Sequence, residues 1–412
     1  MDEQNNAYPN FQDYHVLLIS PAVISSSKKA VSKNNEEVNK DSENGWSFLP
    51  TDLLNLIMTR LSSMADFSTF RAVCPTWRSL ASLCPENLAY QSPLLLLTSP
   101  KKDIFGLYDF TRKRLYNMRL SIRTQQEPEK PYCIDYWTCL SYSHGFLVIA
   151  NMPGFTEIML YNIFTGNRIM LPAVKQIEGN LQFIFSSSPA SPGCLVVMFT
   201  RGSCSFHFCC IGDVEWKCHC FYRLQLIDDM IFYYGKLYLL VSLNQFISID
   251  FGCCLEQIRV EKEKWLSRTL LNEHSMRLES RLAQSCSELL LIQQRKAYLY
   301  DYIKLKCPNR LISIYRWDFS AGAWTEVSSL GGRALFFTDS FTASVPPTCF
   351  GVQANSIYYY SAGYYPETGK KKPIIWSEIS LEDGHGTIRT VYHEPPSKEL
   401  SSAVTWILPS MS

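Results

Sequence analysis

The chain has 412 residues, a length that suggests about two or three domains. Because 46% of the residues are hydrophobic and 19% are charged, it can bury a large core and is not disordered over most of its length. Its 39 Lys and Arg residues balance its 38 Asp and Glu residues, which argues against a protein held mainly by nucleic-acid phosphates. The sequence lacks the run of about 18 apolar residues that a membrane span needs. We therefore expect neither a nucleic-acid nor a membrane partner.

The chain contains 15 cysteines but begins with a poor export signal. Two acids and no Lys or Arg come first, and the apolar run at 16–19 is short. We therefore expect a location in the cytoplasm or the nucleus, where cysteines stay reduced and a thiol packs as a small apolar group.

The first 45 residues are predicted to be a disordered N-terminal segment. Within 25–45 only Ala30, Val31 and Val38 are apolar. Such a segment cannot bury enough surface to offset the entropy lost on ordering.

Residues 46–90 are predicted to form three short helices. The first contains apolar residues at helical spacing, with Pro50 in its first turn. The second runs from about Asp66, a suitable N-cap, to Cys74, and Pro75 ends it and opens the third. So small a unit cannot hide all of its apolar side chains, so another part of the chain or another protein must cover the surplus.

From about residue 92 the pattern changes to short apolar runs separated by turn residues, which is typical of strands. The predicted strands are 94–97, 105–108, 145–150, 158–161, 194–200, 230–234, 236–241, 246–251, 288–293, 312–319 and 356–360. Helical periodicity appears weakly at 260–284.

A loose repeat runs through this region, in which an apolar strand leads into a polar turn and a further strand. It begins at Leu107, Leu160, Ile247 and Ile314. A period near 50 residues with several short strands is typical of propeller blades. We therefore predict a mainly β protein, with a β-propeller of six or seven blades at 92–405; two stacked β-sandwiches are the alternative.

The segment 46–90 resembles an F-box. The matching residues are Leu49, Pro50, Asp52, Leu53, Leu54, Ile57, Leu61, Asp66, Phe70, Val73, Cys74, Trp77, Arg78 and Leu80. Pro75 stands where the pattern often has a polar or basic residue, and it suits the start of a helix.

The rest of the chain resembles the plant F-box proteins of the KIB/SKIP type, in which a kelch-like β domain follows the F-box. The matching passages are 144–148 with 160–172, 229–250, and 333–338 with 355–360. Phe146 replaces the usual Trp, Ile163 the usual Pro, and Ser361 the usual Asp.

This resemblance implies the substrate-recognition subunit of an SCF-type cullin–RING E3 ubiquitin ligase. The F-box would dock on the SKP-type adaptor, and the propeller would hold an unknown protein substrate. The residues that would carry docking are Leu49, Pro50, Leu53, Leu54, Ile57, Leu61, Val73, Cys74, Trp77 and Leu80. Some of these must also hold the helices together, and the sequence does not sort them.

We expect no catalytic residue, cofactor or metal. One alternative is an adaptor-binding scaffold without a ligase role; another is a propeller hydrolase, which would need clustered acids or a Ser–His pair at the central channel. His144 matches a family passage, but it precedes a strand and is predicted to be a turn residue rather than a base. The Cys- and His-rich run at 204–220 suggests a zinc site or, as we expect from the aromatic residues between them, buried thiols.

A substrate surface is expected on loops at one rim of the β domain. The candidates are 125–138, 151–155 and 340–350, and a lysine run at 370–372 is expected to be a solvated loop. The sequence does not identify individual substrate-binding residues.

Overall fold

The computed structural model describes the parts of the chain that form helices, strands and their nearer turns. These residues are 49–61, 64–81, 93–99, 102–119, 136–152, 157–163, 166–174, 181–221, 225–241, 245–252, 259–265, 277–296, 312–338, 341–346, 348–349, 351–360, 374–381, 387–393 and 402–408. The segment predicted to be disordered, 1–45, lies outside them.

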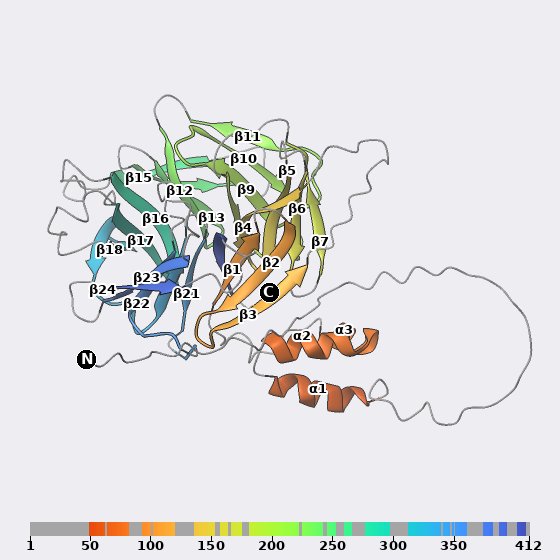
Figure 1. Cartoon of the computed structure of the whole chain (residues 1–412). Coiled ribbons are helices and arrows are strands. Elements are labelled where there is room, and N and C mark those ends of the chain that lie inside the picture. The colour runs from red at the N-terminus through yellow and green to blue at the C-terminus, as the bar shows by residue number, and fades with distance from the viewer. Residues whose placement is uncertain are drawn as a thin grey trace, which may run out of the picture.

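Three helices form a small unit beside the β domain (Figure 1). They are α1 (Thr51–Arg60), α2 (Met64–Val73) and α3 (Pro75–Leu80). Pro50 directly precedes α1, and its carbonyl accepts a hydrogen bond from the Leu54 N–H at 3.1 Å. Asp66 lies in the first turn of α2 rather than at the predicted N-cap, while Pro75 opens α3 as predicted.

The β domain is a propeller of six blades, so the propeller prediction is confirmed and the sandwich alternative is wrong. Blade one contains β25 (Ser402–Ile407), β1 (Leu94–Ser99), β2 (Lys102–Asp109) and β3 (Arg114–Arg119). Blade two contains β4 (Tyr136–Ser143), β5 (Phe146–Met152), β6 (Ile158–Asn162) and β7 (Arg168–Leu171). Blade three contains β8 (Leu181–Phe185), β9 (Leu195–Thr200), β10 (Ser205–Cys210) and β11 (Lys217–Cys220). Within each blade the strands are given from the channel outward.

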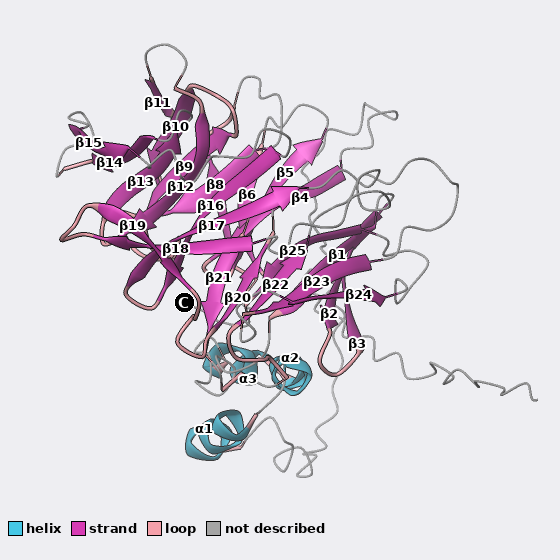
Figure 2. Cartoon of the chain, turned by 90° about the vertical axis from the view of Figure 1, so that its left-hand side faces the viewer, coloured by secondary structure: helices cyan, strands magenta, loops and turns pink. Residues whose placement is uncertain are grey.

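The remaining blades follow in chain order around the ring (Figure 2). Blade four contains β12 (Ile227–Tyr233), β13 (Lys236–Val241), β14 (Gln245–Asp250) and β15 (Arg259–Trp265). Blade five contains β16 (Arg277–Ser285), β17 (Glu288–Lys296), β18 (Ile312–Asp318) and β19 (Ala323–Val327). Blade six contains β21 (Thr342–Val345), β20 (Ala334–Phe337), β22 (Ser356–Tyr360), β23 (Ile374–Ser380) and β24 (Thr387–His393). Blade six has a fifth strand because β21 turns back on β20, which leaves β20 parallel to β22.

The two ends of the β domain meet in blade one. The C-terminal strand β25 pairs with β1 and lies innermost, where it contacts β4 of blade two. Its Trp406 is fully buried and packs edge-on against Phe336 of blade six, with ring centroids 5.1 Å apart. A strand from each end of the domain therefore closes the ring.

The sequence repeat corresponds to one structural position, the hairpin between the third and fourth strands of a blade. It occurs in β2–β3, β6–β7, β14–β15 and β18–β19. In three of these turns an aspartate accepts backbone N–H groups that follow it: Asp109 from Thr111, Asp250 from Gly252 and Asp318 from Ser320. The polar residue of the repeat thus satisfies the backbone of the turn.

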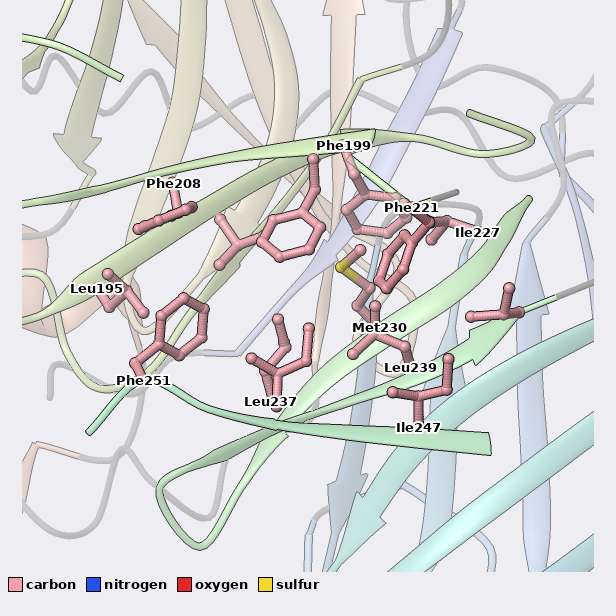
Figure 3. Close-up of a cluster of buried hydrophobic side chains, with 14 residues drawn as sticks. Leu195, Phe199, Phe208, Phe221, Ile227, Met230, Leu237, Leu239, Ile247 and Phe251 are labelled. Atoms are coloured by element: carbon pink, nitrogen blue, oxygen red, sulfur yellow. The ribbon is translucent and has the colours of Figure 1, made fainter. Parts of the chain in front are cut away.

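The apolar residues of each strand fill the space between neighbouring blades. Figure 3 shows the cluster between blades three and four, where Phe208 and Leu195 face Leu237 and Phe251. Alternate side chains of β10 point to opposite faces of the blade, as the period-two pattern predicts. Phe206 and Phe208 enter this cluster, whereas Cys209 enters the cluster shared with blade two.

The weak helical pattern at 260–284 is a wrong prediction for the described residues in that range. They form most of β15 and β16, which are paired strands. Both strands are rich in charged residues, so their apolar residues fall at irregular intervals that imitate helical spacing.

Replacing Trp406 by Ala should lower the free energy of unfolding by about 3–5 kcal/mol, because it leaves a cavity where the ring closes. Urea unfolding followed by tryptophan fluorescence measures this change. Met170→Ala, at a half-exposed residue of β7, is the control and should change stability by less than about 0.5 kcal/mol. Equal effects of the two substitutions would contradict the closure described above.

Candidate functional site

The helical unit lies beside the propeller, with α2 toward the blades and α1 on the far side, in both views (Figures 1 and 2). Arg71 of α2 is close enough to Tyr161 of β6 for the two groups to affect each other's ionisation. Helix α1 is thus the part of the unit that faces away from the β domain.

One face of α1 is buried inside the helical unit. Leu54 and Met58, one turn apart, are buried and join Phe67, Phe70 and Trp77 in a core of their own. The rings of Phe70 and Trp77 lie 4.6 Å apart, which fixes α3 against α2.

A second face of α1 is apolar and exposed. Pro50, Leu53 and Leu56 follow one another at intervals of three residues, so they lie along one side of the helix. Leu53 is 47% exposed and Leu56 51%, and Val73 at the end of α2 is 44% exposed. We call Pro50, Leu53 and Leu56 the apolar stripe.

Arg71 connects α2 to the residue that follows α3. The Arg71 guanidinium donates to the Ala81 carbonyl at 3.2 Å and lies 5.9 Å above the Phe67 ring. Arg78 donates in turn to the Arg71 carbonyl. Burial and the neighbouring Arg78 lower the pKa of Arg71.

The structure divides the ten predicted docking residues into three groups, a division that the sequence left open. Leu54 and Trp77 are buried in the core of the unit and hold the helices together; Pro50, Leu53 and Val73 are exposed; and Leu49, Ile57, Leu61, Cys74 and Leu80 are half-buried at the edge of that core. The list omitted Leu56, although its position three residues after Leu53 was a signal for the exposed face.

A cavity of about 430 Å³ runs along the innermost strands of the propeller. Its lining includes Gln182 of β8, Asp229 of β12 and Arg281 of β16, all of which are buried. The turns that follow β4 and β12 also line it, and there His144 and Tyr234 have positive φ angles of 47° and 44°, each before a glycine. His144 is therefore a turn residue, as predicted.

Charged groups connect the blades around this cavity. Arg201, after β9, donates to the Asp229 carboxylate at 3.0 Å, and the other oxygen of Asp229 accepts from the Leu282 N–H at 2.7 Å. Burial raises the pKa of Asp229, although Arg201 and two backbone N–H groups act in the opposite direction. Three successive blades are thereby joined through one carboxylate.

A Ser–His pair does occur at the channel. Ser143 Oγ lies 2.8 Å from His144 Nδ1, and both residues line the cavity. A catalytic base also needs a group that orients it and donors for an oxyanion. No hydrogen bond between described residues joins His144 to a carboxylate, so the pair by itself does not define an active site.

The cysteine run of blade three is only partly buried. Cys209 is buried as expected, but Cys204, Cys218 and Cys220 are exposed, so the expectation of buried thiols is wrong for these three. Cys218 and Cys220 are exposed because β11 is an outermost strand, and Cys204 lies in the turn before β10. Partial desolvation and the neighbouring Cys220 raise the pKa of the Cys218 thiol to about 11. The described residues contain no group of three or more His, Cys, Asp or Glu side chains that could hold a metal ion.

Most of the predicted substrate loops lie outside the described residues. In 125–138 only the first residues of β4 are described, and in 151–155 only the end of β5. In 340–350 the described residues include β21, which lies next to the channel; the lysines at 370–372 are not among them. No helix in the described part of the chain has the length and apolar character needed to cross a membrane.

Comparison with known proteins covers both parts of the chain. The F-box domain model matches residues 46–88, and the model of the KIB1-4 beta-propeller matches residues 107–392. F-box protein KIB3 of Arabidopsis thaliana is 24% identical over 83% of this chain and 75% of its own. F-box/kelch-repeat protein At3g18720 of the same plant is 22% identical over 71% of this chain and 73% of its own.

Similarity is higher over one short stretch of the chain. F-box protein At2g17690 of Arabidopsis thaliana is 46% identical over 50 residues, 12% of each chain.

The helices and the blades together thus define an F-box protein with a six-bladed propeller. More specifically, the chain belongs to the KIB1-4 beta-propeller family of plant F-box proteins.

Replacing Leu54 by Ala should lower the free energy of unfolding of the helical unit by about 2–5 kcal/mol, because the side chain is fully buried. The neighbouring Leu53→Ala should change it by less than about 0.5 kcal/mol. Amide hydrogen exchange of α1 and α2 measures both changes. Loss of protection in Leu53→Ala equal to that in Leu54→Ala would contradict the division into buried and exposed faces.

Proposed function

We propose that this protein is the substrate-recognition subunit of an SCF-type cullin–RING E3 ubiquitin ligase. Its F-box docks on the SKP-type adaptor, and its propeller holds the protein to be ubiquitinated. The observation that carries this proposal is the apolar stripe. This F-box buries one apolar face of α1 and leaves Leu53 and Leu56, on the opposite side of the helix, about half exposed.

The stripe has the character of a protein-binding surface rather than of a ligand pocket. It is convex, because it follows one side of a helix, and it combines aliphatic side chains with Pro50 at its start. A stable contact on it should bury on the order of 1,000 Å² or more around a few apolar anchors. The half-buried Ile57 and Leu61 lie beside the stripe and would extend the contact.

The protein itself performs no bond chemistry in this proposal. It holds a target lysine near an enzyme that carries activated ubiquitin, and so raises the effective concentration of the reacting groups. A propeller closed by both ends of the domain suits this role, because a rigid holder maintains the distance between the target and the adaptor. The Ser–His pair at the channel does not support the alternative of a hydrolase, for the reasons given above.

Leu53→Asp and Leu56→Asp should each reduce co-purification of the SKP-type adaptor by tenfold or more, because each places a charge in an apolar contact without a partner. Affinity purification of the tagged full-length chain, with adaptor quantified by immunoblot, measures the loss. Asn55→Asp is the matched control: it adds the same charge to an exposed residue on another side of α1 and should leave adaptor binding unchanged.

The docking proposal would be wrong if both stripe variants retained the adaptor at the wild-type level. A loss in Asn55→Asp as large as that in Leu53→Asp would point to damage to the helix instead. Amide hydrogen exchange of α1 in the three variants separates these cases, because damage to the helix lowers its protection whereas loss of the contact alone does not.

A ligase role, as opposed to an adaptor-binding scaffold, requires a substrate that is modified. Purification from plant tissue in the presence of a proteasome inhibitor should recover both the adaptor and at least one ubiquitinated protein. Leu53→Asp should still bind that protein but leave it unmodified. If ubiquitination of all bound proteins were independent of Leu53, the scaffold would be the better description.

A further inference from the structure

The cysteine run of blade three is a sequence motif that the docking proposal does not use. Its outermost strand β11 carries two exposed thiols, Cys218 and Cys220. Their sulfur atoms lie 3.7 Å apart, in hydrogen-bond contact. The two sulfurs of a disulfide are about 2.05 Å apart, so these two need to approach by only about 1.7 Å to be joined.

The strand itself places the two thiols side by side. Residues two apart in a strand point to the same face, so Cys218 and Cys220 share one face of β11 and His219 points to the other. The ring of His219 packs against Phe206 of β10, with centroids 5.3 Å apart. The residue between the cysteines is thus held by packing, while both thiols remain accessible to a reagent in solution.

We infer that Cys218 and Cys220 form a reversible redox pair, which a small disulfide such as glutathione disulfide oxidises to an intramolecular disulfide. The Cys220 thiolate attacks one sulfur of glutathione disulfide, which forms a mixed disulfide and releases one glutathione thiolate. The Cys218 sulfur then attacks the Cys220 sulfur, and the second glutathione leaves with the Cys218 proton. Two protein thiols are oxidised, and one glutathione disulfide is reduced to two glutathione molecules.

The contact between the thiols assigns the two roles. Partial desolvation and the hydrogen bond to Cys220 raise the pKa of the Cys218 thiol to about 11, so Cys218 keeps its proton at neutral pH. The attacking species in disulfide exchange is a thiolate. Cys220 is therefore the attacking sulfur, and Cys218 resolves the mixed disulfide.

The position of the pair on an outer strand makes the bond reversible. The Cα atoms of residues two apart in an antiparallel strand are separated by about 6.8 Å, at the upper end of the range that a disulfide spans. Strand β11 can bend to close the bond, because within its sheet it pairs with β10 alone. Strained and exposed disulfides of this kind are the readily reduced, regulatory ones.

Peptide mass spectrometry of the purified full-length protein tests this inference. The reduced protein is equilibrated with mixtures of reduced glutathione and glutathione disulfide, alkylated with iodoacetamide and digested with trypsin. Cleavage after Lys217 and Arg223 leaves both cysteines on one peptide, 218–223. The internal bond makes that peptide unlabelled and lighter by two hydrogen atoms.

The exposed Cys286, in the turn after β16, is the internal control because it is the sole cysteine of its tryptic peptide, 282–295. The pair should be half-oxidised at about tenfold less glutathione disulfide than half-modification of Cys286 needs. The reason is that the Cys218 thiol acts on the mixed disulfide at a high effective concentration, whereas at Cys286 free glutathione removes the adduct.

Two single variants give a matched comparison. Cys218→Ser should stop at the mixed disulfide, so that peptide 218–223 carries one glutathione and no internal bond. Cys286→Ser makes the same change at the control cysteine and should leave the internal bond as in the wild type.

The inference would be overturned if the wild-type pair needed as much glutathione disulfide as Cys286. It would also be overturned if the bond joined peptide 218–223 to peptide 202–217, which contains Cys204, a thiol close enough to Cys218 to affect its ionisation. None of these substitutions lies in the helical unit, so adaptor co-purification should be unchanged. This inference and the docking proposal therefore fail separately.

Discussion

Helix α1 is ten residues long and apolar on two sides, and three short helices can bury only one of them. Leu54 and Met58 enter the core with Phe67, Phe70 and Trp77, and this leaves Leu53 and Leu56 outside. These two pairs of residues lie on different sides of α1. Rotating the helix to bury the second pair would therefore expose the first. The exposed stripe is therefore a consequence of the helix itself, and a partner must supply what the unit lacks.

The propeller does not cover this surface. Helix α2 lies between α1 and the blades, and its Arg71 donates to the Ala81 carbonyl after α3 and lies near Tyr161 of blade two. The side of the unit turned to the blades is thus occupied, whereas the stripe on α1 is directed away from them (Figure 1). A partner can bind there without disturbing the ring.

The sequence predicted the parts of the molecule that rest on local chemistry. Pro75 opens a helix because its missing N–H is not needed there. The repeat at Leu107, Leu160, Ile247 and Ile314 marks equivalent hairpins, and in three of the four an aspartate satisfies the turn. It could not sort Leu53 from Leu54, since both are leucines and only packing distinguishes them. It also missed outer strands such as β11, whose exposed residues carry no apolar period, and it could not assemble the channel, to which Gln182, Asp229 and Arg281 come from three blades.

Ring closure completes both blade one and the cavity on the propeller axis. Blade one, beside the helical unit, lacks its innermost strand until β25 has been made, because that strand comes from the C-terminal end of the β domain. The same strand contacts β4, and beyond it Leu408 accepts a hydrogen bond from the Tyr142 hydroxyl at 2.6 Å. Tyr142 lines the channel, so the cavity too is complete only in the closed ring. The helical unit, by contrast, has its own core and needs none of these contacts. A chain without β25 would therefore retain the core of the helical unit but lack a finished channel.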